Sequence, residues 1–149
     1  MDPDRDDDPG FDEDDAPAPP APAAPLLRSP RRLLVVDDEP GVRQTLARLL
    51  RHAGHQVVEA PDGPSALEVL ATAEVDCVLT DLSMPGMSGY TLARAVKTAR
   101  PGLPVILLSG WQDAEPEDQA DRQAVDAILG KPVKVPELLQ TIEVLTREA

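Results

Sequence analysis

The stretch LLVVDDEPG, residues 33 to 41, places an apolar run directly against three consecutive carboxylates, Asp37, Asp38 and Glu39. Four apolar residues in a row are typical of a strand that is buried on both faces of a sheet. Neighbouring carboxylates repel one another, and partial removal from water adds a further cost. The arrangement therefore indicates a cation-binding place at the end of a buried strand.

Similar apolar runs recur along the chain and alternate with helical patterns. The runs are LLVV (33–36), QVVEA (56–60), DCVLTD (76–81), PVILLS (104–109) and DAILG (126–130). Helical patterns cover residues 40–54, 64–73, 88–100 and 135–149, with a weaker and more polar one at 115–124 that we expect to be short. This alternation predicts an α/β fold, a doubly wound five-stranded parallel sheet of flavodoxin-like order 2-1-3-4-5.

The first thirty residues differ in composition from the rest of the chain. They hold nine Asp and Glu against Arg5 and Arg28, and eight of the seventeen prolines. Such a segment has almost nothing to bury. We therefore expect residues 1–30 to be a disordered acidic, Pro-rich tail and residues 31–149 to form one domain.

Composition also excludes several classes of function. The net charge of -13 argues against binding of a nucleic-acid backbone, which needs clustered Lys and Arg. There is no apolar run long enough to span a membrane and no secretory signal pattern, so we expect a cytoplasmic protein. The single cysteine, Cys77, lies in an apolar run and is predicted to be a buried structural thiol. His52 and His55 are predicted to be ordinary surface residues.

Polar side chains follow the predicted strands where those strands end. They are Asp37 and Asp38, Asp81, Ser109 and Lys131. In a sheet of the predicted order, all five converge on one edge, at the point where the strand order reverses. Three carboxylates are a site for a hard divalent ion, and Mg²⁺ is favoured because it binds through few carboxylates and keeps several waters. A hydroxyl and an ammonium nearby suggest a bound anion, most simply a phosphoryl group.

Four motifs in register carry a family resemblance. VVDDEP, TDLSMPGMSG, LLSG and GKPV, in this order and spacing, resemble the receiver domain of two-component response regulators over residues 32–147. The resemblance implies that Asp81 is the phosphoacceptor, which attacks the phosphohistidine of a sensor histidine kinase or a histidine phosphotransfer protein. It also implies that Mg²⁺ is bound directly by Asp38, more loosely by Asp37, and by Asp81 and the backbone carbonyl of Ser83.

The remaining roles follow from the same resemblance. Lys131 would pair with the phosphoryl oxygens, the Ser109 hydroxyl would bond to one of them after transfer, and the Lys131–Pro132 peptide bond would be cis. The family commonly has an aromatic residue at the position that Ile128 occupies here. Because isoleucine is stiff at χ1, we predict a smaller, packing-type switch in the loop 109–115 and the fourth helix. Trp111 stands at a position that the family uses to tune dephosphorylation.

Three functions remain open at this stage. The chain ends one helix after Lys131, so we expect a single-domain response regulator that signals through a phosphorylation-dependent contact with a downstream protein. An alternative is a phosphorelay intermediate or phosphate sink that exchanges with a histidine phosphotransfer protein. A phosphohydrolase of the haloacid dehalogenase type also uses an Asp nucleophile and Mg²⁺, but that family has a second Asp two residues later, where Ser83 stands.

Overall fold

The computed structural model describes residues 30–110 and 119–147, and within them strands and helices alternate as predicted. The strands are β1 (Arg32–Val36), β2 (Gln56–Ala60), β3 (Cys77–Asp81), β4 (Val105–Ser109) and β5 (Ala127–Gly130). The helices are α1 (Pro40–His52), α2 (Gly63–Thr72), α3 (Gly89–Ala99), α4 (Gln119–Ala124) and α5 (Val135–Thr146). The predicted tail and Trp111 lie outside the described residues, apart from Pro30.

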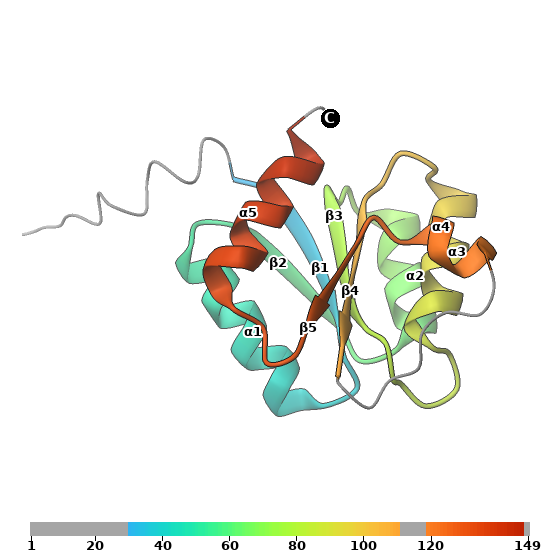
Figure 1. The fold of residues 1–149 in the computed structure, drawn as a ribbon, viewed down its shortest axis with the longest axis horizontal. Coiled ribbons are helices and arrows are strands. Elements are labelled where there is room, and N and C mark those ends of the chain that lie inside the picture. The colour runs from blue at the N-terminus through green and yellow to red at the C-terminus, as the bar shows by residue number, and fades with distance from the viewer. Residues whose placement is uncertain (1–29, 111–118, 148–149) are drawn as a thin grey trace, which may run out of the picture.

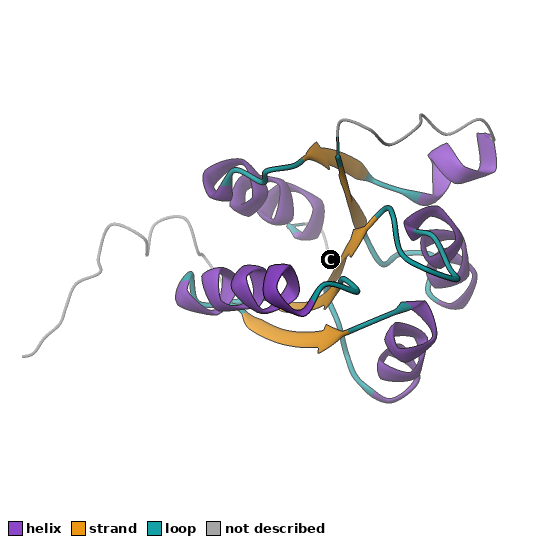
Figure 2. Cartoon of the chain, turned by 90° about the horizontal axis from the view of Figure 1, so that it is seen from below, coloured by secondary structure: helices purple, strands orange, loops and turns teal. Residues whose placement is uncertain are grey.

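All neighbouring strands run parallel, in the order β2-β1-β3-β4-β5 that the sequence predicted. Helices α1 and α5 cover one face of the sheet, and α2, α3 and α4 cover the other (Figure 1). The view in Figure 2 shows the strands as a twisted central layer between the two groups of helices. Because the order reverses between β1 and β3, the carboxyl ends of these two strands form the switch point of the fold.

The strands are buried because both faces of the sheet are covered. Every residue of β3 is buried, and so are four of the five residues of β1. Their side chains alternate between two cores, one under α1 and α5 around Leu50 and Ile142, and one under α2 and α3 around Leu92. Cys77 is fully buried, as predicted, and burial raises the pKa of its thiol.

Helix boundaries follow local signals in the sequence. Asp62 accepts a hydrogen bond from the amide of Ser65 (2.8 Å) and so caps α2, and Ser88 caps α3 in the same way. Helix α1 ends before Gly54, whose φ of 108° lies in the left-handed region. Within the weak predicted helix of 115–124, the described helical turn is Gln119–Ala124, which is short as expected. None of the described helices is long and apolar enough to span a membrane.

One histidine departs from the prediction. His52 is exposed, but His55 is only 5% exposed, so its assignment to the surface was wrong. Its Nδ1 accepts a hydrogen bond from the backbone N–H of Arg31 (3.0 Å), because that amide, just before β1, needs an acceptor at the buried end of the sheet. Burial lowers the pKa of His55, and the positive charge of Arg31 lowers it further.

Candidate functional site

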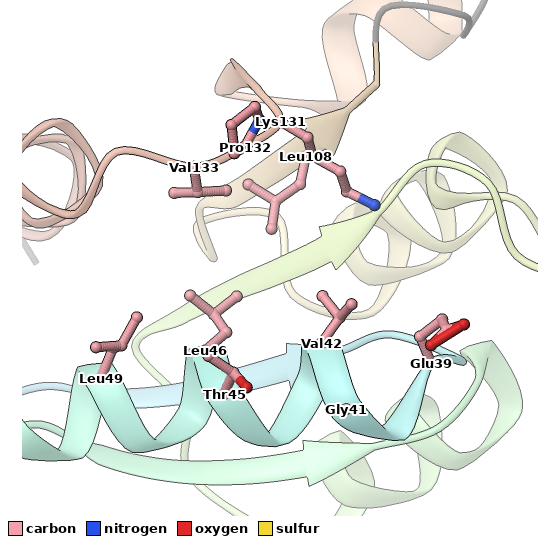
Figure 3. A pocket seen from close by; sticks show the side chains of 10 residues that line it. All are labelled: Glu39, Gly41, Val42, Thr45, Leu46, Leu49, Leu108, Lys131, Pro132 and Val133. Carbon is pink, nitrogen blue, oxygen red and sulfur yellow. The ribbon is translucent and has the colours of Figure 1, made fainter.

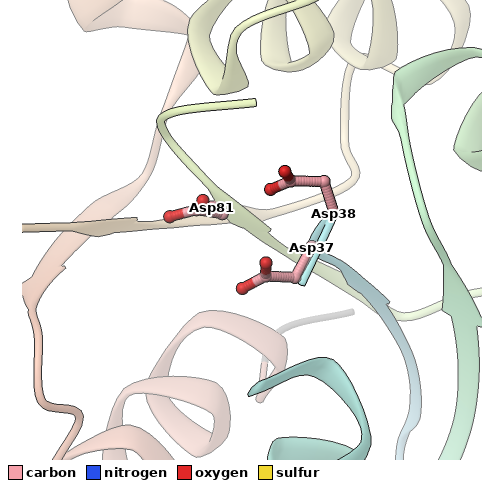
Figure 4. A group of neighbouring side chains, drawn as sticks. All are labelled: Asp37, Asp38 and Asp81. Carbon is pink, nitrogen blue, oxygen red and sulfur yellow. The ribbon is translucent and has the colours of Figure 1, made fainter. Parts of the chain in front are cut away.

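Three carboxylates meet at the carboxyl ends of β1 and β3. Val36 pairs with Thr80 in the parallel register, so the residues that follow, Asp37 and Asp81, lie at the same level of the sheet. One carboxylate oxygen from each of Asp37, Asp38 and Asp81 lies within 4.8 Å of the others. Figure 4 shows the three side chains pointing to the same side of the strand ends. The predicted convergence of these acids is therefore present in the structure.

Asp37 is the most unusual of the three acids because it is both buried and incompletely hydrogen-bonded. Its side chain is 3% exposed, and Oδ1 accepts a hydrogen bond from the amide of Glu39 (2.9 Å). Among the described residues, the buried Oδ2 has no hydrogen-bond partner. Burial raises the pKa of Asp37, and the negative charges of Asp81 and Asp38 add to that effect. A buried carboxylate oxygen without a donor fits a ligand to a hard cation.

Asp38 differs from its neighbour in its exposure. Asp37 is buried, whereas Asp38 is exposed to solvent at the same rim. The cluster therefore combines a buried oxygen donor with one that solvent reaches directly. Mg²⁺ usually keeps several waters, and an open rim of this kind leaves room for them. The expectation that Asp38 ligates more directly than Asp37 stays a prediction.

A cationic side chain lies beside Asp81. Lys131 Nζ forms an ion pair with Asp81 Oδ1, an oxygen that is otherwise buried without a hydrogen bond. The Asp81 side chain is 7% exposed and the Lys131 side chain 34%. The backbone N–H of Lys131 donates to the carbonyl of Ser109 (2.9 Å), and the Lys131–Pro132 bond is cis, as the resemblance implied. Lys131 is thus held beside Asp81 by the end of β5.

The two predicted serines lie at the same edge of the sheet. Ser109 is the last residue of β4 and follows Leu108, which pairs with Asp81. In this conformation the Ser109 hydroxyl donates to the carbonyl of Gly110 (3.3 Å). Ser83 is exposed in the loop after β3, two residues beyond Asp81. Metal ligation by the Ser83 carbonyl stays a prediction.

The loop between β3 and α3 packs directly against the backbone of Asp81. The amide of Gly89 donates to the carbonyl of Leu82 (2.8 Å), which brings the start of α3 onto the end of β3. A Cβ atom on Gly89 would lie 2.5 Å from the Asp81 carbonyl oxygen and 2.6 Å from Leu107 Cδ1. Gly89 is therefore required by this close approach. In the same loop, Gly86 has a φ of 85° and supplies a left-handed turn.

An apolar groove adjoins the site. It lies between α1 and the loop that follows β5, with a volume of about 650 Å³. Figure 3 shows Val42, Leu46 and Leu49 of α1 on one side, with Leu108, Pro132 and Val133 facing them. Val42 and Leu49 are 46% and 41% exposed. Glu39 and Lys131 also line the groove, so it is continuous with the charged site.

Two further residues complete the description. Ile128, on the edge strand β5, is 47% exposed and pairs with Leu107. Arg43 of α1 donates from Nη1 to the carbonyl of Asp37 (2.9 Å), a contact that the sequence interpretation missed. In the sequence, this residue is only an arginine at the fourth position of α1, beside the apolar stripe. An arginine at such a position is typical of an exposed charge, so it does not predict the contact.

The sequence of the chain matches a known protein family. The family model described as response regulator receiver domain matches residues 33–143. The chain belongs to the response regulator receiver domain family. Receiver domains are phosphorylated by histidine kinases or phosphotransfer proteins, bind Mg²⁺ at an acidic site, and are generally phosphoacceptors rather than enzymes.

Curated relatives of the receiver domain are longer proteins. The transcriptional regulatory protein GlrR of Escherichia coli K12 is 38% identical over 118 residues, which are 79% of this chain and 27% of GlrR. The sensor histidine kinase RcsC of the same organism is 38% identical over 110 residues, 74% of this chain and 12% of RcsC. The chain thus spans about a quarter or less of the length of these relatives.

Solved receiver domains have the same fold. A response regulator receiver domain protein from Clostridium thermocellum superposes with a TM-score of 0.74 at 29% identity, over 79% of this chain and 95% of that one. The response regulator TrrA from Thermotoga maritima, solved in complex with Mg²⁺ and BeF, gives a TM-score of 0.70 at 30% identity, over 77% of this chain and 98% of that one.

Proposed function

We propose that Asp81 accepts a phosphoryl group from a histidine of a sensor kinase or phosphotransfer protein in a Mg²⁺-dependent reaction. The observation that carries the proposal is the cluster of Asp37, Asp38 and Asp81 with Lys131 paired to Asp81. This is the donor set that phosphoryl transfer to a carboxylate requires, since the reaction depends mainly on positioning and on offsetting charge.

Asp37, Asp38, Asp81 and the Ser83 carbonyl would hold the Mg²⁺ ion. The unpartnered Oδ2 of Asp37 supports this assignment, because a bound cation would supply the partner that this buried oxygen lacks. When bound, Mg²⁺ offsets the negative charge on the oxygens of the transferring group. The rest of the reaction is carried by side chains of the chain itself.

Asp81 acts as the nucleophile. A carboxylate oxygen forms the new bond to phosphorus while the bond from phosphorus to the imidazole nitrogen of the donor breaks. That nitrogen keeps the electron pair and takes up a proton, so the donor returns to neutral histidine. The product is an acyl phosphate on Asp81, and the loop that Gly89 anchors fixes the backbone from which Asp81 attacks.

Lys131 and Ser109 respond to the transferred group. Lys131 pairs with Asp81 before transfer and exchanges this contact for the phosphoryl oxygens afterwards. The Ser109 hydroxyl turns from the Gly110 carbonyl towards one of those oxygens. These two movements at the ends of β4 and β5 change the surface next to Ile128, through which a downstream protein is contacted.

The apolar groove supports a protein as the phosphodonor. Val42 and Leu49 are exposed on α1, and the groove runs up to Lys131. A partner that covers these side chains buries apolar surface and places its histidine at the rim where Asp81 lies. The net charge of -13 does not suit a nucleic-acid partner.

Phosphorylation by a small donor tests the proposal. Purified protein is incubated with acetyl phosphate, with and without Mg²⁺, and the covalent phosphoryl group is detected by intact mass. We expect modification in the wild type only with Mg²⁺, and none in Asp81→Asn. Asp76→Asn is the matched control because Asp76 lies at the opposite end of β3, where its carboxylate accepts from the Arg32 amide (2.8 Å). Undiminished modification of Asp81→Asn would contradict the assignment.

A further inference from the structure

Arg43 connects α1 to the buried acid of the site. Its Nη1 donates to the backbone carbonyl of Asp37 (2.9 Å), and its Nε donates to Glu59 Oε1 on β2 (3.2 Å). The Arg43 side chain is only 14% exposed, so the guanidinium is held in place. One rigid group thus bridges a helix, a neighbouring strand and the peptide that carries Asp37.

The Asp37 peptide is fixed from three directions. Its N–H donates to the carbonyl of Ala60 at the end of β2 (3.2 Å). Its carboxylate Oδ1 accepts from the amide of Glu39 (2.9 Å), and its carbonyl accepts from Arg43. Of these three contacts, only the Arg43 contact comes from the side chain of another residue, so it can be removed by substitution without altering the acid. The Arg43 contact also closes the turn between β1 and α1, just beyond the last residue of β1.

The charge of Arg43 is partly offset by Glu59, which also pairs with Arg51. Glu59 pairs with Arg43 through Oε1 and with Arg51 through Oε2 (3.4 Å), and Arg51 also donates to the carbonyl of Val57. Two guanidiniums share one carboxylate, so one net positive charge remains, and by itself that charge would weaken the binding of a cation. Any gain in Mg²⁺ affinity from Arg43 must therefore come from positioning. A planar guanidinium can donate in two fixed directions at once, which a lysine ammonium on a flexible stem does not reproduce.

We infer that Arg43 is a positioning residue for the Mg²⁺ site, an inference that rests on the proposed function. Arg43 holds the Asp37 backbone so that the Asp37 carboxylate lies next to those of Asp38 and Asp81 before the ion arrives. Without this bond, binding Mg²⁺ must also order the Asp37 peptide, and that entropy cost weakens the affinity. Removal of partners that orient metal ligands typically lowers affinity about 10–100-fold.

The test measures Mg²⁺ binding directly, without phosphorylation. Titration calorimetry on the full chain, at a temperature where circular dichroism shows every variant folded, gives the dissociation constants. We expect Arg43→Met to bind Mg²⁺ about tenfold more weakly, and Arg43→Lys to restore only part of the loss. Arg48→Met is the matched control, because Arg48 is an exposed arginine of the same helix, and its affinity is expected to match wild type.

A second readout separates positioning from general stability. With acetyl phosphate as donor, the Mg²⁺ concentration for half-maximal phosphorylation should rise about tenfold in Arg43→Met, while the rate at saturating Mg²⁺ stays within about twofold of wild type. If both Arg43 variants bind Mg²⁺ within twofold of wild type and only their melting temperatures fall, Arg43 is merely structural and the inference is overturned.

Two other outcomes are also decisive. If neither Arg43 variant folds, Glu59→Gln replaces them, and Glu68→Gln, which removes an exposed carboxylate from α2, controls for the lost negative charge. We expect Glu59→Gln to bind Mg²⁺ about threefold more weakly than Glu68→Gln because the guanidinium loses its charged partner, and equal binding overturns the inference. If the wild type itself binds no Mg²⁺, the proposed function fails and this inference fails with it. Binding and phosphorylation of the wild type together with normal binding by the Arg43 variants refute the Arg43 role alone.

Discussion

Replacement of Asp37 by asparagine is expected to stabilise the metal-free protein. The Asp37→Asn side chain has the same shape, and its Oδ1 still accepts from the Glu39 amide. Its Nδ2 takes the place of the buried Oδ2 that has no described partner. The substitution removes one negative charge from a cluster in which burial and the neighbouring acids already raise the pKa of Asp37. It therefore relieves a repulsion that the metal-free fold contains.

The size of the effect follows from the spacing of the carboxylates. Two unit charges 4.8 Å apart repel by about 3.5 kcal/mol at an effective dielectric constant of about 20. The ammonium of Lys131 and the solvent around the exposed Asp38 offset part of this repulsion. We expect a net increase of about 1–2 kcal/mol in the free energy of unfolding, or about 4–8 °C in the melting temperature.

Urea unfolding and thermal melts in EDTA, and again in an excess of Mg²⁺, check this prediction. In wild type, Mg²⁺ should raise the melting temperature, whereas in Asp37→Asn it should have little effect because a ligand is lost. Glu68→Gln removes one exposed carboxylate from α2 and controls for net charge. A metal-free Asp37→Asn less stable than wild type, or one stabilised by Mg²⁺ as much as wild type, would refute the reasoning.

Two further predictions concern the packing around the site and the opposite end of the sheet. Gly89→Ala should lower the free energy of unfolding by about 1–3 kcal/mol in urea titrations and slow phosphorylation, because the added methyl collides with the Asp81 carbonyl. Gly41→Ala should do neither, because a methyl added at Gly41 has no other atom within 4 Å. His55 has a lowered pKa in the fold, so the unfolded chain binds its proton more readily and the free energy of unfolding should fall as pH drops below about 6.5. His55→Asn keeps an acceptor for the Arg31 amide, and it should reduce the fall in the free energy of unfolding between about pH 7 and 5. If the free energy of unfolding of the variant falls with pH as steeply as that of wild type, His55 is not the source of the pH dependence.

Much of the fold could be predicted because its signals are local. Runs such as CVLTD are apolar at consecutive positions, and they alternate with helical patterns along the chain. Each of these depends on residues within a turn or two of one another, so the sequence displays them directly. The acids at the strand ends could be placed at one rim because parallel strands end at the same edge.

Contacts between segments distant in space were not visible in the sequence. His55 was assigned to the surface because no local pattern shows that the Arg31 amide, twenty-four residues away, needs its imidazole. The contact of Gly89 with the Asp81 carbonyl depends on how α3 returns to β3, and no local pattern displays it. Arg43 likewise reads as a surface charge until α1 is packed beside β2.

The sequence by itself determined the element order, the chemistry at the strand ends and the family, because these follow from short-range periodicity and from motifs in register. Only the tertiary structure decided that Asp37 is buried while Asp38 is exposed, and that Asp81 pairs with Lys131. The physical reason is that the burial of Asp37 and the pairing of Asp81 with Lys131 depend on where these side chains point. Asp37 and Lys131 lie just after the ends of β1 and β5, where the chain leaves the sheet. Those directions are set by packing between helices and strands rather than by neighbours along the chain.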